Sequence, residues 1–430
     1  MLGAFANAFR TPDLRRKLLF VLLILVVFRL GSQVPTPGVN VANVQACFEQ
    51  TKNDGIYGLI NLFSGGALLQ LTVFALGIMP YITASIILQL LVVVIPRLEA
   101  LKKEGQAGQT KITQYTRYLT LALAILQATG IVALARSRQL LQGCPNALLH
   151  NENSLETMLV MVITMTAGTV VIMWFGELIT DRGVGNGMSL LIFAQIIATF
   201  PASLWQVKVA NGWWVFGVVT VIGLALVAAV VFLEQGQRRI PVQYARRMVG
   251  RKMFGGSSTY IPLKVNQAGV IPVIFASSLM YLPAMGAQFS GNSGWASFIS
   301  TYLVTGDHPL YMATYFLLII FFTYFYVAIT FNPEEVADNM KKYGGFIPGI
   351  RAGKPTEEYL AYVLSRITLP GSLYLGLISL IPLVAFVLIG ANQNFPFGGV
   401  SVLIMVGVAL DTVKQIESQL QQRNYEGFLR

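Results

Sequence analysis

The most constraining feature of this chain is a series of long apolar segments that contain almost no charged residues. Such segments recur along all 430 residues, of which 55% are hydrophobic and only 11% charged. A typical soluble domain carries about 25% charged residues, so a water-soluble fold is excluded. A bilayer core is about 30 Å thick and a helix rises about 1.5 Å per residue, so a run of about 20 residues can cross it once.

These segments predict an all-α integral membrane protein with ten transmembrane helices. Helices are the only plausible form, because an open strand in lipid leaves backbone groups unpaired and barrel strands would alternate polar with apolar residues. No cleavable signal peptide precedes the first apolar run, so we expect it to remain as a span. The expected spans are residues 18–34, 74–95, 118–135, 155–175, 188–204, 213–233, 265–285, 310–330, 367–388 and 397–410.

The distribution of Lys and Arg predicts the orientation. With the N-terminus inside, the inner segments hold 24 of the 30 basic residues and the outer loops hold 4. Basic residues are in excess in cytoplasmic loops, so both termini are expected in the cytoplasm. Cys47 and Cys144 then fall in outer loops. A disulfide between them is conceivable, but two unpaired thiols are the expected state.

Residues 56–96 break the simple pattern, because this stretch has no charge, is too long for one span and is interrupted by polar residues. If it crossed twice, the basic loop 97–111 would move outside and the charge rule would fail. If it crosses once, its first part is a short re-entrant segment. We favour the single crossing. Irregular backbone at membrane depth is tolerated only where it is buried in protein or lines a water-filled cavity, which predicts an external cavity.

The sequence offers no chemistry at membrane depth. Ionisable residues are almost absent from the spans, and His150 and His308 lie in outer loops. We therefore expect no catalytic residue, metal site or cofactor. The glycine run 183–187 resembles a phosphate-binding loop in letters only, because no strand precedes it, and it fits a tight turn. Gly353-Lys354 lacks the Ser or Thr of a Walker motif, so any energy source must come from a partner.

Several motifs resemble the SecY/Sec61-alpha family of protein-conducting channel subunits. They run in the family's order through nearly the whole chain: VFRLGS at 27–32, PTPG at 35–38, FSGGA at 63–67, ALGIMPYI at 75–82, KKEG at 102–105, RGVGNG at 182–187, GQRRIP at 236–241, PLKVN at 262–266, NPEE at 332–335 and FIPGIR at 346–351. The resemblance implies a channel for unfolded secretory polypeptides. It also implies two inverted-repeat halves of five helices, residues 1–205 and 206–430, that hinge between the fifth and sixth spans.

The resemblance implies a plug and a seal in the conduit. The re-entrant segment, residues 56–71, would fill the external funnel at rest, with plug residues Ile56, Leu59, Ile60, Asn61, Phe63, Ser64, Gly65 and Gly66. A hydrophobic constriction blocks ions by dewetting and can widen around a passing chain. By similarity the pore ring is Ile78, Ile82, Met188, Ile192, Ile274 and Ile404, in which Met188 replaces the isoleucine usually expected. Each of these residues alone could equally be a packed or lipid-facing side chain.

The same family opens sideways through a lateral gate, which by resemblance involves Ser85, Gln89, Asn266 and Ser278. Signal sequences have apolar cores of 7–15 residues, and ten apolar residues favour lipid by roughly 3–6 kcal/mol. Exposure to lipid would therefore sort segments by partitioning, without catalysis. The four polar side chains could hold the gate closed by interhelical hydrogen bonds of roughly 0.6–2 kcal/mol, or they could make ordinary contacts between helices.

The loops 234–264 and 331–366 are expected in the cytoplasm and carry a basic cluster. Its members are Arg238, Arg239, Arg246, Arg247, Arg251 and Lys252, with Arg351 in the second loop. They could serve orientation alone, or dock on ribosomal RNA phosphates or on the SecA motor ATPase. Lys252 stands where the family often has Arg, which weakens bidentate phosphate recognition.

The resemblance implies further partners and a location. The partners are the small membrane subunits SecE and SecG, signal sequences, nascent polypeptides and membrane lipid, and the location is the bacterial inner (plasma) membrane. The competing class is a secondary transporter of small solutes. That class would share inverted repeats, but it needs a polar or ionisable site at the midplane, whereas the expected ring is apolar.

Overall fold

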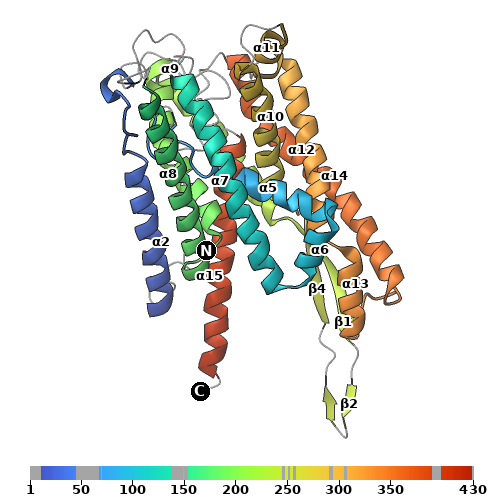
Figure 1. Cartoon of the computed structure of the whole chain (residues 1–430). Helices are drawn as coiled ribbons and strands as arrows, with labels where there is room; N and C mark the ends of the chain where they lie inside the picture. The colour runs from blue at the N-terminus through green and yellow to red at the C-terminus, as the bar shows by residue number, and fades with distance from the viewer. Residues whose placement is uncertain are drawn as a thin grey trace.

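The computed structural model places most of the chain in long helices that run side by side (Figure 1). It describes residues 11–44, 67–68, 70–136, 149, 154–244, 247–249, 252–254, 258–289, 294–304, 308–389 and 399–428. The long helices are α2 (Pro12–Gly31), α5 (Met79–Val94), α7 (Gln106–Arg136), α8 (Leu155–Arg182), α9 (Gly187–Gln235), α10 (Ile271–Phe289), α12 (Pro309–Thr330), α14 (Lys354–Ile389) and α15 (Gly399–Phe428).

Every expected span overlaps one of these helices, with spans five and six both inside α9. Among the described residues, five helices are long and apolar enough to cross a membrane, or six if the bent pair of α5 and α6 (Pro96–Lys103) counts as one. The start of α9, Gly187–Pro201, and the start of α10, Ile271–Met280, are shorter apolar helices. The chain is therefore a multi-pass membrane protein, while the number of ten spans stays a prediction.

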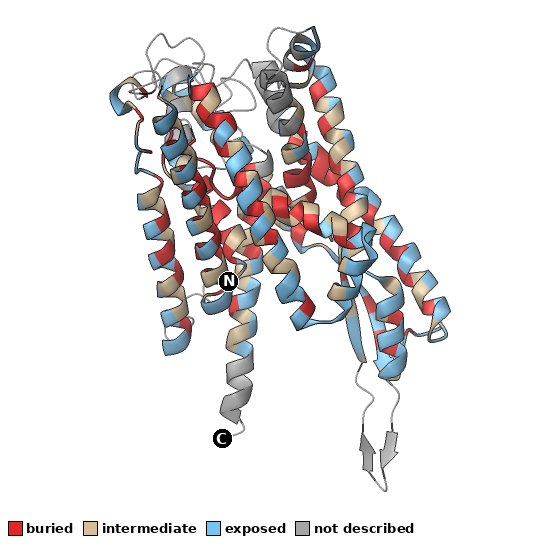
Figure 2. Ribbon diagram, in the orientation of Figure 1, coloured by how far each residue is buried: buried red, intermediate tan, exposed pale blue. Residues whose placement is uncertain are grey.

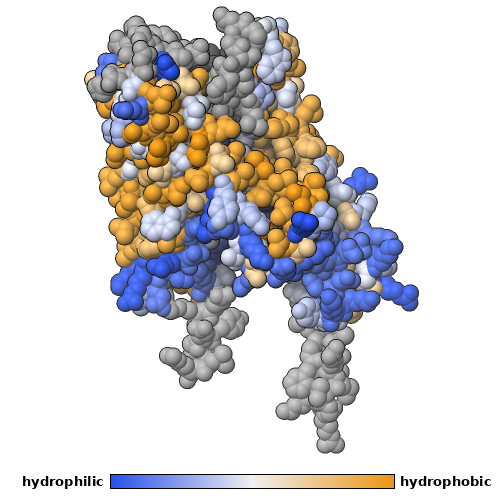
Figure 3. All heavy atoms as spheres, viewed as in Figure 1, coloured by the Kyte–Doolittle hydropathy of each residue, from blue (hydrophilic) through white to orange (hydrophobic). Residues whose placement is uncertain are grey.

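The surface agrees with this interpretation. Figure 2 shows buried residues on the faces that the helices turn towards one another. Figure 3 shows apolar side chains over the middle of the helices and hydrophilic ones at the end that carries α6 and α13 (Pro333–Lys342). An apolar belt next to a polar end is the surface expected of a protein that spans a bilayer.

The expectation of an all-helical chain misses a small sheet in loop 234–264. Strand β1 (Gln237–Tyr244) pairs antiparallel with β4 (Ser258–Lys264) and with β5 (Gly345–Phe346). Ile240 and Val242 alternate inward along β1 and pack on a cluster that includes Met340 of α13 and Leu360 of α14. Two-residue periodicity in a stretch rich in charge is a weak signal beside the apolar spans, which explains the error.

The ribbon continues into a second pair of strands, β2 (Arg247–Val249) and β3 (Lys252–Phe254). Figure 1 shows this pair at the far end of the ribbon, beyond α13 and the ends of the helices. A small helix α11 (Gly294–Ile299) and a π-helix η1 (Ser300–Val304) lie at the opposite end of the molecule.

A kink divides α9 at the place where the hinge between the halves is expected. Gly212 has φ 80° and ψ 177°, so the helical backbone is interrupted there. An L side chain rarely adopts this φ, and glycine does so without steric cost. The chain can therefore turn back at Gly212 without a long loop.

Irregular backbone precedes α5, in what we name the α5 corner. Pro35 pairs with Thr72 in an antiparallel bridge, and the Val73 amide donates to the Val34 carbonyl at 2.9 Å. Gly77, two residues before α5, has φ 56°. This corner is buried in protein, as irregular backbone at membrane depth must be.

A second corner precedes α10 and has the same construction; we name it the α10 corner. Gln237 pairs with Lys264 in the last rung of β1 and β4, and the Val265 amide donates to the Gly236 carbonyl at 3.0 Å. Gly269, two residues before α10, has φ 62°.

The two corners lie at opposite ends of the bundle. Leu14 at the start of α2 packs with Val184 and with Ile416 of α15. The α10 corner is at that end, because Lys264 reaches Asp411 of α15 at 3.5 Å. The α5 corner follows the other end of α2, a helix of 20 residues that is therefore about 30 Å long.

Candidate functional site

The six residues expected to form the pore ring belong to one apolar cluster. They come from four elements: Ile78 and Ile82 from the start of α5, Met188 and Ile192 from α9, Ile274 from α10 and Ile404 from α15. Four of them are buried, and Ile82 and Met188 are partly buried against the cluster. The six residues therefore lie within one large apolar core that also holds many other side chains, and their role as a seal stays a prediction.

The turn between α8 and α9 fixes the first ring residue on α9. The Asn186 side chain caps α9 by accepting from the Met188 amide at 3.0 Å, and Thr180 Oγ1 accepts from the Gly187 amide at 2.9 Å. A Cβ on Gly187 would lie 1.9 Å from the Gly176 carbonyl oxygen, so only glycine fits. The glycine run thus forms a tight turn that sets Met188 against α8.

Among the helices proposed for the lateral gate, α10 contacts α5. Ser278 is on α10, and its buried Oγ has no hydrogen-bond partner. On α5, Ser85 is half-buried and Gln89 is exposed. The proposed bonds across the gate are therefore not formed by Ser278 in this arrangement, and the gate role of these residues stays a prediction.

Asn266, the fourth gate residue, makes its contacts within the α10 corner. Its Nδ2 donates to Glu234 Oε2 at 3.0 Å and to the Gly269 carbonyl at 3.2 Å. Asn266 is 3% exposed and Glu234 is 7% exposed. Burial of a carboxylate is costly unless it is hydrogen-bonded, so this pair marks a site where position is held by a polar bond.

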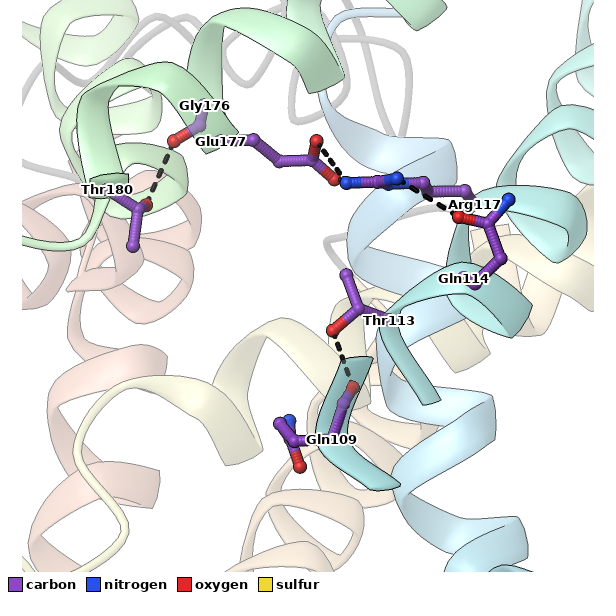
Figure 4. Close-up of polar contacts among 7 residues, drawn as sticks. All are labelled: Gln109, Thr113, Gln114, Arg117, Gly176, Glu177 and Thr180. Atoms are coloured by element: carbon purple, nitrogen blue, oxygen red, sulfur yellow. Dashed lines mark hydrogen bonds and ion pairs between the residues drawn. The ribbon is translucent and has the colours of Figure 1, made fainter. Parts of the chain in front are cut away.

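A second carboxylate ties α7 to α8 (Figure 4). The Arg117 guanidinium donates to both oxygens of Glu177 at 2.8 Å and to Gln114 Oε1 at 3.0 Å. The bidentate geometry is the strongest that a side-chain ion pair adopts. Helix α7 is therefore held to its neighbour in one register.

The basic residues expected at the docking surface occupy the ribbon and its surroundings. Arg238 and Arg239 are exposed on β1, and the Arg239 guanidinium lies 4.9 Å from the centre of the Tyr260 ring. Arg247 is in β2 and Lys252 is in β3. Arg351 follows β5 and is exposed. Arg246 and Arg251 lie outside the described residues.

The eight plug residues between 56 and 66, together with Cys47, Cys144 and His150, also lie outside the described residues. The later part of the expected plug segment is described and is buried: Ala67 and Leu68 are 1% exposed and Leu71 is 0% exposed. The plug assignment stays a prediction.

Sequence reasoning missed Glu234 and the pairing of Arg117 with Glu177. The available signal was their position, because each lies at or just beyond the end of an apolar run. Ionisable residues near a membrane interior are functional candidates by default, and each should have been assigned a partner.

The helix arrangement matches solved protein-conducting channels. The structure described as "The structure of a protein conducting channel" aligns over 94% of this chain and 91% of its own, with TM-score 0.63 and 18% identity. Sec61 in the canine ribosome-channel complex aligns over the same shares with TM-score 0.59 and 17% identity. At this identity the likeness establishes the fold alone. It defines a multi-pass membrane protein with a channel fold.

Sequence comparison identifies the family. The SecY family profile matches residues 72–413. The chain is 70% identical over 437 residues to the protein translocase subunit SecY of Streptomyces galbus, and 62% identical over 443 residues to that of Mycobacterium tuberculosis (strain ATCC 25618 / H37Rv), covering 100% of each chain in both cases. This chain belongs to the SecY family, which confirms the resemblance drawn from the motifs.

Proposed function

We propose that this chain is the central pore-forming subunit of a protein translocase. It passes unfolded secretory polypeptides across the membrane and releases signal sequences and membrane spans sideways into lipid. The observation that carries the proposal is the apolar cluster, which gathers six ring residues from four helices, three of which begin at a tight turn or an irregular corner. Full-length relatives named as translocase subunits support it.

The ring would seal the channel against ions while a polypeptide passes through it. Water leaves a narrow apolar constriction, so ions lose their hydration there and do not pass. Leucine-sized side chains offer a translocating peptide no polar partner to which it could stick, so the peptide slides. Met188 adds a flexible thioether that fills irregular gaps.

The proposed membrane architecture has ten spans in two inverted halves, with both termini in the cytoplasm of a bacterial cell and the chain in its plasma membrane. The two corners support the inverted halves, since equal constructions precede α5 and α10 at opposite ends of the bundle. The bacterial relatives and the excess of inner basic residues support the location and the orientation.

The proposed partners follow from the surfaces. The basic ribbon suits the phosphates of ribosomal RNA or acidic groups on the SecA motor, and the channel structure seen with a ribosome supports such docking in the fold. SecE and SecG would cover lipid-facing helices. A transporter of small solutes would need a polar site at the midplane. The ring residues are apolar, which argues against that function.

Photo-crosslinking tests the proposal. A photoreactive amino acid replaces Ile82 or Ile274 in the purified translocase, and a secretory chain is stalled during passage. We expect adducts at both positions and none at the lipid-facing control Leu224, which is 62% exposed. Adducts at Leu224 alone, or accumulation of a small solute in channel-containing liposomes, would overturn the proposal.

A further inference from the structure

We propose that Glu234 is a positioning residue for the gate helix α10, which it holds through Asn266. The inference rests on the proposed function, because it concerns the gate of that channel. Glu234 acts through the side-chain amide of Asn266, at the corner where α10 begins.

The bond is the main polar attachment of Asn266. The side-chain Nδ2 donates to Glu234 Oε2 and to the Gly269 carbonyl, while the buried Oδ1 has no hydrogen-bond partner. The hydroxyl of Tyr374, on α14, is also buried without a partner. Loss of the Glu234 carboxylate would leave Nδ2 with only a bond inside its own turn, and nothing polar would then tie this side chain to α9.

Glycines let neighbouring helices close around the same corner. A Cβ on Gly371 of α14 would lie 2.4 Å from the Val265 carbonyl oxygen, and one on Gly407 of α15 would lie 3.2 Å from Val270 Cγ2. The corner is therefore packed against both helices. The bond of Glu234 to Asn266 is its side-chain tie to α9, beside the backbone bond of Val265 to Gly236. Buried, tightly packed groups respond to the loss of one partner, because water cannot replace it at low cost.

The geometry connects this tie to the gate. Helix α10 begins five residues after Asn266 and carries Ile274 of the expected ring and Ser278 of the proposed gate. A shift of the corner would move the whole start of α10 relative to α5. On this proposal, the position of α10 beside the gate depends on the corner at its start.

Distance measurements across the gate test the inference. In a Cys47→Ser, Cys144→Ser background, spin labels at Ser85→Cys and Ser278→Cys report the closed and open populations in the resting complex. We expect Glu234→Ala to raise the open-to-closed ratio about tenfold, which corresponds to about 1.4 kcal/mol. Glu234→Gln keeps an acceptor oxygen and should remain close to the unmodified ratio.

A double variant separates positioning from a general loss of stability. Glu234→Leu with Asn266→Leu removes the bond and leaves neither side chain unpaired, so a positioning role predicts that the open-to-closed ratio stays raised, about as much as with Glu234→Ala. A return to the unmodified ratio would mean that Glu234→Ala acts only through the cost of an unpaired amide, and would overturn the inference. Tyr374→Phe is the matched control; it removes an unpartnered hydroxyl from the same region and should change nothing. A ratio unaltered by Glu234→Ala, or shifted as strongly by Glu234→Gln, would overturn the inference.

The measurement is independent of translocation. Spin-label distances in the resting complex report the corner even if the chain transported no polypeptide, whereas the crosslinking experiment above tests transport alone. A normal crosslink with an unaltered distance ratio would refute the role of Glu234 and leave the proposed function standing.

Discussion

The α5 corner and the α10 corner share one backbone design but are filled by different side chains. The sequences VFALGIMPYI at 73–82 and VNQAGVIPVI at 265–274 place valine, glycine, proline and isoleucine at equal spacing. Each valine amide donates to the end of the preceding long helix segment, and each glycine has a positive φ. The isoleucines that end the two stretches, Ile82 and Ile274, both belong to the expected ring.

The difference lies in the residue after each valine. The Phe74 ring stacks on Phe28 of α2 with centroids 5.8 Å apart, whereas Asn266 bonds to Glu234 of α9. Apolar packing is non-directional, whereas a hydrogen bond fixes one geometry. The backbone of each corner therefore positions the start of α5 or α10, and the side chain after the valine determines how firmly that start is held.

Removal of the aromatic filling is the strongest way to break the comparison. Phe74→Ala would leave a cavity between Phe28 and Gly31, whose Cβ position is occupied by the Phe74 ring. We expect unfolding in mixed SDS micelles to become easier by about 3–5 kcal/mol, as for other buried Phe→Ala changes. Phe74→Leu should recover part of the loss. A cost below that of Asn266→Ala would show that packing does not dominate the α5 corner.

Both corners pack against a glycine of a neighbouring helix, and alanine substitutions test whether each corner requires one. A Cβ on Gly168 of α8 would lie 2.1 Å from the Val73 carbonyl oxygen, and one on Gly371 would lie 2.4 Å from that of Val265. Backbone cannot yield cheaply, so Gly168→Ala and Gly371→Ala should each destabilise by about 1–3 kcal/mol.

Gly217 provides the matched control for both alanine variants. It lies on the exposed part of α9 with nothing within 4 Å of a Cβ, so Gly217→Ala should be neutral or slightly stabilising. The same unfolding assay measures all three variants. A tolerated alanine at Gly371 with a damaging one at Gly168 would mean that the two corners are not equivalent.

The sequence could predict a multi-pass protein of apolar helices, because absence of charge over about 20 residues leaves few alternatives to a membrane helix; the number of ten spans stays a prediction. The pore ring stays a prediction that rests on the resemblance and on four short or broken segments; the structure adds that its six members lie in one apolar core. The corners could not be predicted by periodicity, because their contacts join residues about 40 positions apart, such as Val34 and Val73. The ribbon was missed because its charged edge hides the alternation of Ile240 and Val242.

A smaller effect is expected at the ion pair that joins α7 to α8. Arg117 binds Glu177 through two parallel bonds of 2.8 Å, and both side chains are partly exposed. Arg117→Lys keeps the positive charge but cannot donate two parallel hydrogen bonds to the carboxylate. We therefore expect the free energy of unfolding to fall by about 1 kcal/mol in the same assay. Glu177→Gln should cost a similar amount. If neither variant differs from the unmodified chain, α7 and α8 are held together by packing alone.

The smallest expected effect concerns the surface pair on α6, which lies beyond the apolar part of α5. Lys103 Nζ lies 2.7 Å from Glu99 Oε1, and this hydrogen bond lowers the pKa of the Glu99 carboxyl below its usual 4.5. The same bond raises the pKa of Lys103, with a further contribution from Glu334 of α13.

The sign of the pH dependence follows from these two directions. The Glu99 contribution is present above about pH 4.5 and is lost as the pH falls through the lowered pKa of the carboxyl; that of Lys103 is present below its usual value and lost at higher pH. Because both groups are exposed, the pair contributes little. Unfolding midpoints of the unmodified chain and Lys103→Gln should therefore differ slightly at pH 7 and converge on acidification. A gap that persists or widens in acid would mean that Lys103 does not act through a carboxylate, and would contradict the assignment of this pair as its source.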